Sequence, residues 1–444
     1  MTPSLDSLRA ELAELIAIPS LSADPAHAED VRAAAEWVAA RVRTAGGEAE
    51  LVDWEGRPLA VGEVRASRAP QSAPTVLCYG HFDVQPPDPL ELWSSPPFEL
   101  TETDGWLVAR GVVDDKGQLF MLLKATELLA AAGELPVNVR FACDGEEEIG
   151  GHSIVDWLAA DERGADVAVV FDSGMQRPGV PELNVAMRGL CYLHVEVRTG
   201  ARDLHSGMYG GAALNAAHAL QQTLAGVLPV DGRVPAPLRA GVVPPGADEL
   251  AGWRGLQPGA EVLAEQGARP ADPRAAEELY LRTWAEPSVD VHGLACGSPR
   301  LIKTVLPVHA EANLSVRLVP DQDPDAIAET MTELLRAAAP AGAEVDVTVQ
   351  SRNPPALVPA DAPAIQVALD VFEEVVGRRP LLVRSGGSIP LVAALVERGI
   401  PPIVTGFALP DSNLHSPDER MRSEYLPLGV ETARTLLRRF GDLR

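Results

Sequence analysis

Five polar segments of this chain carry residues that bind metal ions or transfer protons, and most of them directly follow an apolar run. Histidine nitrogens and carboxylate oxygens suit zinc and related divalent ions. Burying this many carboxylates without cations would cost roughly several kcal/mol per charge, and two metal ions that share a carboxylate would offset this cost. The segments are Gly80–Asp83, Arg110–Gly117, Cys143–Gly150, Phe171–Gly174 and Asn413–Glu419.

Each segment alone has an ordinary structural explanation. His81 and Asp83 could form a salt bridge, and Asp114 with Asp115 could cap a helix. The acidic run Asp144–Glu148 could be a solvated turn. The combination of all five, mostly behind strand-like runs, favours a metal site instead.

The elements that must position these residues predict an α/β fold. Apolar runs at Thr75–Tyr79, Val137–Phe141 and Val167–Phe171 indicate strands, and helical patterns separate them. Because these strands are apolar on both faces, we expect a largely parallel sheet covered by helices. In such sheets ligands bind at the carboxyl ends of the strands, where the polar segments begin.

The pattern changes after Arg188. Strand-like runs in which apolar and polar residues alternate predict a sheet with one face in water. We therefore expect an inserted α+β domain at 188–354, within a catalytic domain formed by 1–187 and 355–444. The proline-rich stretch Pro229–Pro245 indicates a loop inside the insert.

Composition excludes several classes of protein. The net charge of −26 argues against nucleic-acid binding. No apolar run reaches the roughly 18–20 residues of a membrane span, and the N-terminus shows no secretory signal. The four cysteines are widely spaced and form no CxxC pair, which is typical of buried free thiols in a reducing compartment. These features predict a cytoplasmic protein.

The ordered motifs resemble those of the carnosinase and cytosolic non-specific dipeptidase group. This group belongs to a superfamily that also holds aminoacylases, carboxypeptidase G and succinyl-diaminopimelate desuccinylase. The resemblance covers nearly the whole chain and is highly specific to the superfamily. Besides the metal segments it includes Asp203–Gly207 with Gly210-Gly211, Lys303–Pro307, Arg317–Pro320 and Gly386–Pro390.

The resemblance implies a centre with two Zn²⁺ per chain, for which Mn²⁺ or Co²⁺ could substitute. His81 and Asp172 would bind one zinc, Glu148 and His415 the other, and Asp114 would bridge both through a non-proline cis peptide to Asp115. Asp83 would orient the ring of His81. A water activated by the two zinc ions would attack the substrate, with Glu147 as the general base.

The resemblance also implies roles for the inserted domain as lid and dimerisation domain of a homodimer. His205 would stabilise the oxyanion from the partner subunit, and Thr304 would reach across in the same way. Arg317 would bind the terminal carboxylate of the substrate, while Gly387 and Ser388 would line the pocket. From the residues alone, His205, Thr304 and Arg317 could equally belong to a solvated sheet face.

Departures from the family pattern leave the substrate open. Carnosinase-like dipeptidases tend to carry glutamate before the glycine pair, where this chain has Ser385, and this weakens the case for recognition of a free amino terminus. Asp144 and Ala216 are minor departures. We expect a dipeptidase, with an amidohydrolase acting on N-acyl or N-carbamoyl amino acids as the alternative.

Two other classes are weaker interpretations. A serine hydrolase would need a nucleophile elbow, and no complete G-x-S-x-G segment occurs. A non-catalytic peptide-binding protein would lack a ligand or the general base, and none of the expected positions is missing.

Overall fold

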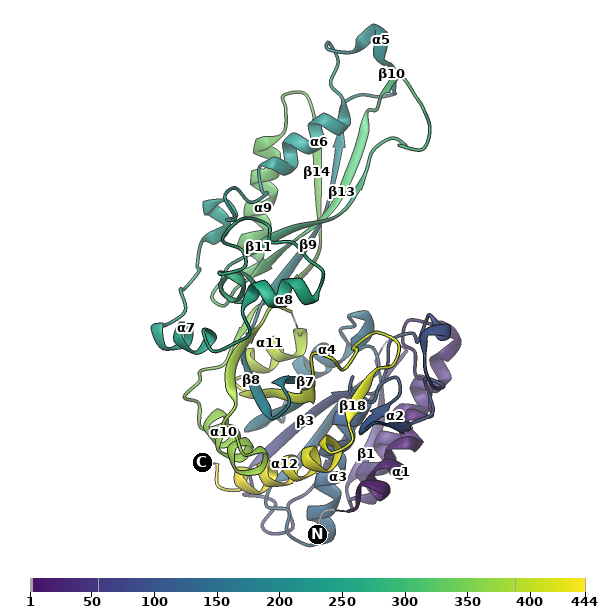
Figure 1. The fold of residues 1–444 in the computed structure, drawn as a ribbon, viewed down its shortest axis with the longest axis vertical. Helices are drawn as coiled ribbons and strands as arrows, with labels where there is room; N and C mark the ends of the chain where they lie inside the picture. Colours follow the sequence, from purple (N-terminus) through teal and green to yellow (C-terminus); the bar gives the residue numbers. More distant parts are fainter. Residues whose placement is uncertain (1–2, 55, 388, 444) are drawn as a thin grey trace. The chain divides into compact units, whose positions relative to one another are not determined.

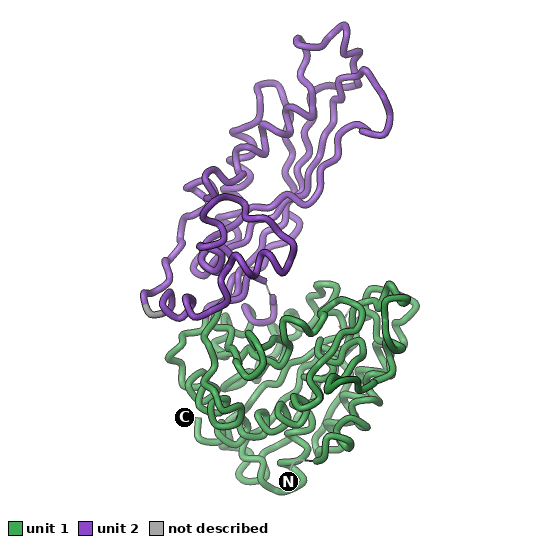
Figure 2. The backbone as a smooth tube through the Cα atoms, in the orientation of Figure 1, with its two compact units in different colours: residues 1–185, 358–383, 394–444 green, residues 186–357, 384–393 purple. Residues whose placement is uncertain are grey.

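The computed structural model describes residues 3–54, 56–387 and 389–443, which divide into two compact units (Figure 2). Unit 1 takes the chain up to Val185, then Val358–Val383 and the residues from Ala394 onward. Unit 2 comprises Ala186–Leu357 and Arg384–Ala393. The long insert of unit 2 begins and ends within three residues of the bounds expected from the sequence. The short segment Arg384–Ala393, which we expected in the catalytic domain, is an addition to it.

Unit 1 is built on a mixed sheet. β3 pairs in parallel with β6 and β7, and β17 pairs in parallel with β7, whereas β1, β2 and β8 add antiparallel pairings. The α/β fold with a largely parallel core is therefore confirmed. In the order of the sheet the strands are β1 (Glu48–Trp54), β2 (Arg57–Val64), β6 (Asn138–Asp144), β3 (Thr75–His81), β7 (Val167–Arg177), β17 (Pro402–Ala408) and β8 (Val180–Met187).

Helices of unit 1 begin and end where local chemistry favours it. Ser4 caps the first helix by accepting a hydrogen bond from the N–H of Ser7, and Pro363 occupies the first position of α10. Gly377 ends α10 with φ +84°, a conformation that glycine adopts without strain. The helices are α1 (Leu5–Ile16), α2 (Ala28–Thr44), α3 (Lys116–Ala131), α4 (Ser153–Ala160), α10 (Pro363–Val376) and α12 (Tyr425–Phe440), together with the second half of α11 (Pro390–Glu397).

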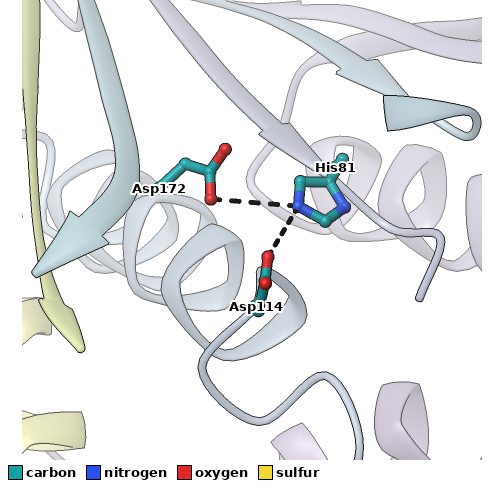
Figure 3. A group of neighbouring side chains, drawn as sticks. All are labelled: His81, Asp114 and Asp172. Atoms are coloured by element: carbon teal, nitrogen blue, oxygen red, sulfur yellow. Dashed lines mark hydrogen bonds and ion pairs between the residues drawn. The ribbon is translucent and has the colours of Figure 1, made fainter. Parts of the chain in front are cut away.

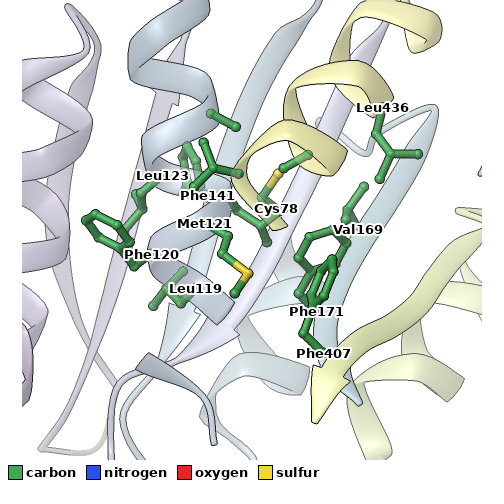
Figure 4. Packing of buried hydrophobic residues seen from close by; sticks show 14 of the residues in the cluster. Cys78, Leu119, Phe120, Met121, Leu123, Phe141, Val169, Phe171, Phe407 and Leu436 are labelled. Atoms are coloured by element: carbon green, nitrogen blue, oxygen red, sulfur yellow. The ribbon is translucent and has the colours of Figure 1, made fainter. Parts of the chain in front are cut away.

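The main core of unit 1 packs the sheet against α1, α2, α3, α10 and α12, and Figure 4 shows the part around α3. α3 contributes Leu119, Phe120 and Met121, which are fully buried. The sheet contributes apolar side chains from four neighbouring strands. Burial of these side chains provides the main stabilisation of the unit, and it fixes the strand ends that carry the polar segments. The labelled sheet residues are Cys78, Phe141, Val169, Phe171 and Phe407.

A small three-stranded sheet also belongs to unit 1. Its outer strand β18 lies just beyond the segment that carries His415. This sheet anchors the histidine segment at its C-terminal end. The strands are β4 (Thr101–Thr103), β5 (Trp106–Val108) and β18 (Arg420–Arg422), with the order β18-β5-β4.

Unit 2 contains an antiparallel four-stranded sheet, in agreement with the period-two patterns (Figure 1). The apolar residues of each strand face helices α6 (Ala216–Ala225) and α9 (Pro324–Ala338) and form a second core. The alternate polar residues occupy the opposite face. The strands, in sheet order, are β11 (Ser288–Ala295), β13 (His309–Leu318), β9 (Gly189–Arg198) and β14 (Glu344–Asn353).

The remaining parts of unit 2 are shorter elements. The proline-rich stretch predicted as a loop contains a 3-10 turn at Ala236–Arg239, and two helices follow it. The short strands β10 and β12 pair with each other, and β15 pairs with β8. The elements are α5 (Ser206–Tyr209), α7 (Ala247–Trp253), α8 (Gly259–Glu265), β10 (Leu204–His205), β12 (Val305–Leu306) and β15 (Ala356–Leu357). The strand β16 (Leu381–Ser385) pairs with β8, and the boundary between the two units falls after its third residue.

Within the described part of the chain, no helix is both long enough and apolar enough to cross a lipid bilayer.

Candidate dinuclear metal centre

The first group of candidate ligands comprises His81, Asp114 and Asp172 (Figure 3). His81 ends β3, Asp114 lies in the turn before α3, and Asp172 lies within β7. The Nε2 atom of His81 is 3.1 Å from Oδ1 of Asp114 and 3.9 Å from Oδ1 of Asp172. His81 and Asp172 converge because the parallel strands β3 and β7 are neighbours in the sheet, and the turn before α3 adds Asp114.

The second group shares Asp114 with the first and adds Glu148 and His415. The Nε2 atom of His415 is 3.0 Å from Oδ2 of Asp114 and 3.1 Å from Oε2 of Glu148. Asp114 therefore directs one carboxylate oxygen to each group. All five ligands expected from the sequence lie in these two groups, and the peptide bond between Asp114 and Asp115 is cis.

Asp83 belongs to neither ligand group but contacts a residue of each. Its Oδ1 atom lies 3.3 Å from Nδ1 of His81, the ring nitrogen that points away from Asp114. Its two oxygens also accept hydrogen bonds from the backbone N–H groups of Glu147 (3.3 Å) and Glu148 (3.1 Å). Asp83 is fully buried. It thus fixes the ring of His81 and the turn that presents Glu147 in one hydrogen-bond network.

Gly80 allows the two loops to pack closely. A Cβ atom at Gly80 would lie 2.7 Å from Oδ2 of Asp115 and 2.9 Å from Cβ of Leu119. The same Asp115 oxygen accepts a hydrogen bond from the backbone N–H of His81 at 3.2 Å. A side chain at position 80 would therefore disrupt the hydrogen bond between Asp115 and the backbone of His81, and only glycine avoids this clash.

In the two ligand groups the carboxylates outnumber the histidines. Burial opposes protonation of His81, but hydrogen bonds to Asp114 and Asp83 outweigh it and raise the pKa of His81 well above its usual value. Hydrogen bonds to Asp114 and Glu148 raise the pKa of His415 to about 10. Burial, reinforced by the neighbouring carboxylates, raises the pKa of Asp172 well above its usual range. Three carboxylates facing two histidines thus form a site that favours positive charge.

The donor set fits divalent cations. Two imidazole nitrogens and three carboxylates supply nitrogen and oxygen ligands of the type that zinc, manganese and cobalt accept. The buried Asp83 holds the outer nitrogen of His81, which is the arrangement that sets the tautomer of a histidine ligand. Glu147 lies between Glu146 and Glu148 in the same turn, outside both ligand groups. Burial raises the pKa of Glu147 above its usual value, which suits a proton acceptor.

Two residues of the site were not assigned from the sequence. Gln85 donates a hydrogen bond from Nε2 to Oε2 of Glu148 at 2.9 Å and fixes that candidate ligand. Glu419 is fully buried, and its oxygens accept hydrogen bonds from the N–H groups of Gly111, Val113 and Asp114. It connects the segment of His415 to the turn of Asp114. In the sequence, the only indication of this connecting role of Glu419 is its position four residues after His415.

Glu419 also pairs with the buried Arg110, whose Nη1 lies 2.7 Å from Oε2 of Glu419. We expect Glu419→Gln to lower the free energy of unfolding by about 3–5 kcal/mol, because it leaves the Arg110 charge buried without its partner. Urea denaturation of the variant and of the wild type measures this difference in the free energy of unfolding. The matched control is Asp370→Asn, which breaks the exposed ion pair with Arg379 and should cost less than about 1 kcal/mol. Equal effects of the two variants would contradict the anchoring role of Glu419.

The other predicted site residues lie in unit 2. His205 is exposed on β10, Thr304 is exposed directly before β12, and Arg317 is on the polar face of β13. The N–H of Gly387 donates to Oγ of Ser385 at 3.1 Å. Ser388 lies outside the described residues.

Comparison with known proteins decides the family. Residues 77–439 match the profile of Peptidase family M20/M25/M40. This chain is an M20-family peptidase. A cysteinylglycine-S-conjugate dipeptidase of Corynebacterium striatum is 30% identical to it over 442 residues, covering 94% of this chain and 92% of the relative. The predicted family and the predicted metallopeptidase class are confirmed.

Solved structures share the fold of this M20 peptidase. A metallo-carboxypeptidase of the M20 family from Sulfolobus solfataricus has a TM-score of 0.86 and 25% identity, and the match covers 99% of this chain and 100% of that chain. Human carnosine dipeptidase 1 has a TM-score of 0.77 and 24% identity, with 99% of this chain and 97% of that chain covered. The second likeness shows the fold alone.

Proposed function

We propose that this M20 peptidase hydrolyses the peptide bond of dipeptides or very short peptides with two zinc ions. The observation that carries the proposal is the pair of ligand groups that share Asp114, with Glu147 in the same turn as Glu148. The dipeptidase names of relatives, such as the cysteinylglycine-S-conjugate dipeptidase and the human Beta-Ala-His dipeptidase, support the substrate class.

His81, Asp114 and Asp172 would hold one ion, and Asp114, Glu148 and His415 the other. When bound, the ions would polarise the scissile carbonyl and lower the pKa of an attacking water. Zinc fits the mixture of imidazole and carboxylate ligands, and Mn²⁺ or Co²⁺ could replace it.

Glu147 would act as the general base and then as the general acid. The backbone N–H groups of Glu147 and Glu148 donate hydrogen bonds to Asp83, which hold this turn in place. The side chain of Glu147 therefore extends from a fixed backbone position next to Glu148. It would take the proton from the attacking water and pass it to the leaving amine. Because the amine leaves as a neutral group, one carboxylate suffices for both transfers.

Unit 2 would supply the contacts to the substrate. Nδ1 of His205 accepts a hydrogen bond from the N–H of Gly207 at 3.1 Å, which assigns the proton of a neutral ring to Nε2. His205 therefore presents an N–H donor suited to an oxyanion. Burial, together with the nearby charge of Arg317, lowers the pKa of Arg188 to about 10. The guanidinium groups of Arg188 and Arg317 together would attract an anion, and this supports our assignment of Arg317 to the substrate carboxylate. Gly387 would line the same substrate site.

We also propose that His205 and Thr304 act across a homodimer formed by the lid domain. Exposed apolar side chains flank both residues and favour contact with a second copy: Met208, Tyr209, Leu301, Ile302 and Val305. The four free cysteines, three of which are buried, support a location in the cytoplasm.

A substrate panel tests the proposal against its alternative. Ser385 replaces the expected glutamate and favours the alternative, an amidohydrolase for N-acyl or N-carbamoyl amino acids. We expect zinc-loaded enzyme to cleave free dipeptides with a higher kcat/KM than N-acetyl or N-carbamoyl amino acids of the same side chain. Turnover of the N-acyl compounds without turnover of any dipeptide would overturn the dipeptidase assignment and leave the metal centre intact.

A further inference from the structure

The polar face of the unit 2 sheet carries an unusual row of like charges. Glu196 of β9 lies directly opposite Glu311 of β13 on one side and Asp346 of β14 on the other. Like charges that face each other across strands destabilise a sheet. Arg198 neutralises only part of this charge, because it contacts Oε2 of Glu196 alone among the three carboxylates (2.8 Å). The three carboxylates of this row therefore favour the binding of a further cation.

Histidine lies within reach of this row. Nε2 of His194 is 3.8 Å from Oε1 of Glu196 and 3.6 Å from Oε2 of Glu311. Four ligands at zinc-ligand distances of about 2.0–2.2 Å in a tetrahedron are roughly 3.3–3.6 Å from one another. The observed separations thus approach those of a metal site. A second histidine lies close by, because Nε2 of His309 is 3.5 Å from Oε2 of Glu196.

The ring of His194 is also set for metal binding. Its Nδ1 atom is 2.8 Å from Oδ1 of Asn313, which can only accept a hydrogen bond. Nδ1 therefore carries a proton, so Nε2 is the nitrogen through which the neutral ring would bind a metal ion. A histidine ligand held through its outer nitrogen in this way is typical of metal sites.

We propose that His194, Glu196 and Glu311 form a separate binding site for a divalent transition-metal ion such as Zn²⁺. Oε1 of Glu196, the oxygen that Arg198 does not contact, is its ligand atom. The side chains are 24–40% exposed, so water completes the coordination and the ion exchanges readily. The ion joins β9 to β13 and stabilises the polar face of this sheet. The site lies wholly in unit 2 and does not depend on the function proposed for unit 1.

Equilibrium dialysis of the full chain against zinc chloride at a series of buffered free concentrations tests the site. We expect His194→Gln and Glu311→Gln each to bind about one zinc ion fewer per chain than the wild type, as loss of one ligand from a three-ligand site requires. The matched control is His292→Gln, which removes a histidine of β11 that bonds to Oγ of Ser315 and stacks on Tyr192. The control should bind as much zinc as the wild type.

Hydrogen exchange gives a second, local readout. Added zinc should slow amide exchange in peptides covering β9 and β13 of the wild type and of His292→Gln, but not of His194→Gln. Dipeptide hydrolysis should be the same in all these variants. Equal zinc binding by His194→Gln, Glu311→Gln and the wild type, or zinc protection that persists without His194, would overturn the proposal.

Discussion

Replacing Glu147 with glutamine should lower kcat by roughly 10²–10⁴-fold, the usual contribution of a general acid–base group. Glutamine has the same shape as glutamate but cannot accept the proton of the attacking water. Because Glu147 lies outside both ligand groups, the metal content should not change. Steady-state kinetics and elemental analysis of the same preparation check the two halves of the prediction.

Glu146→Gln is the matched control for this variant. The side chain of Glu146 accepts a hydrogen bond from the N–H of Ser153 at 2.8 Å and lies 3.4 Å from Arg57, so it has a structural partner of its own. This variant should keep kcat close to that of the wild type. If Glu147→Gln retained kcat within about tenfold, or lost its metal, the role of Glu147 as general base would be wrong.

Asp114→Asn should have the largest effect on metal binding, because Asp114 is the one carboxylate that belongs to both ligand groups. An amide keeps the size of the side chain, but it has only one oxygen and no charge to offer two cations. We expect both ions to bind more weakly, by about 10- to 100-fold or more, and hydrolysis to fall to background at limiting zinc.

Asp172→Asn is the matched control, because Asp172 belongs to one group only. Metal content at a fixed free zinc concentration should fall by about one ion per chain in Asp172→Asn and by about two in Asp114→Asn, as a two-metal centre requires. Equal losses in the two variants would show that Asp114 does not serve both ions.

The convergence of the candidate ligands was predictable because the chemistry of these residues and their places behind apolar runs pointed the same way. His81 ends the buried strand β3, Glu148 follows β6, and Asp172 follows the apolar run at the start of β7. Parallel strands bring their carboxyl ends to one edge. The alternating patterns in β9, β13 and β14 likewise predicted the antiparallel sheet of unit 2, because one face of that sheet is apolar and the other polar.

Residues that act through backbone contacts were not predictable in the same way. Glu419 holds three N–H groups of a turn about 300 residues earlier in the chain, and nothing in the local pattern around it encodes that partner. The antiparallel strands β1 and β2 and the helices α7 and α8 were missed because their segments show weak or short periodicity. The cross-strand row at Glu196 depends on register between β9, β13 and β14, which the sequence does not specify by itself.

The most direct test of the central claim is the metal content of the purified chain, paired with hydrolysis of a dipeptide panel before and after chelation. After gel filtration in metal-free buffer, we expect about two tightly bound zinc or similar ions per chain, as a two-metal centre requires. Chelation should abolish hydrolysis, and added zinc should restore it. Hydrolysis that survives exhaustive chelation in a chain without stoichiometric metal would contradict the account, because His81, Asp114, Glu148, Asp172 and His415 would then not be metal ligands.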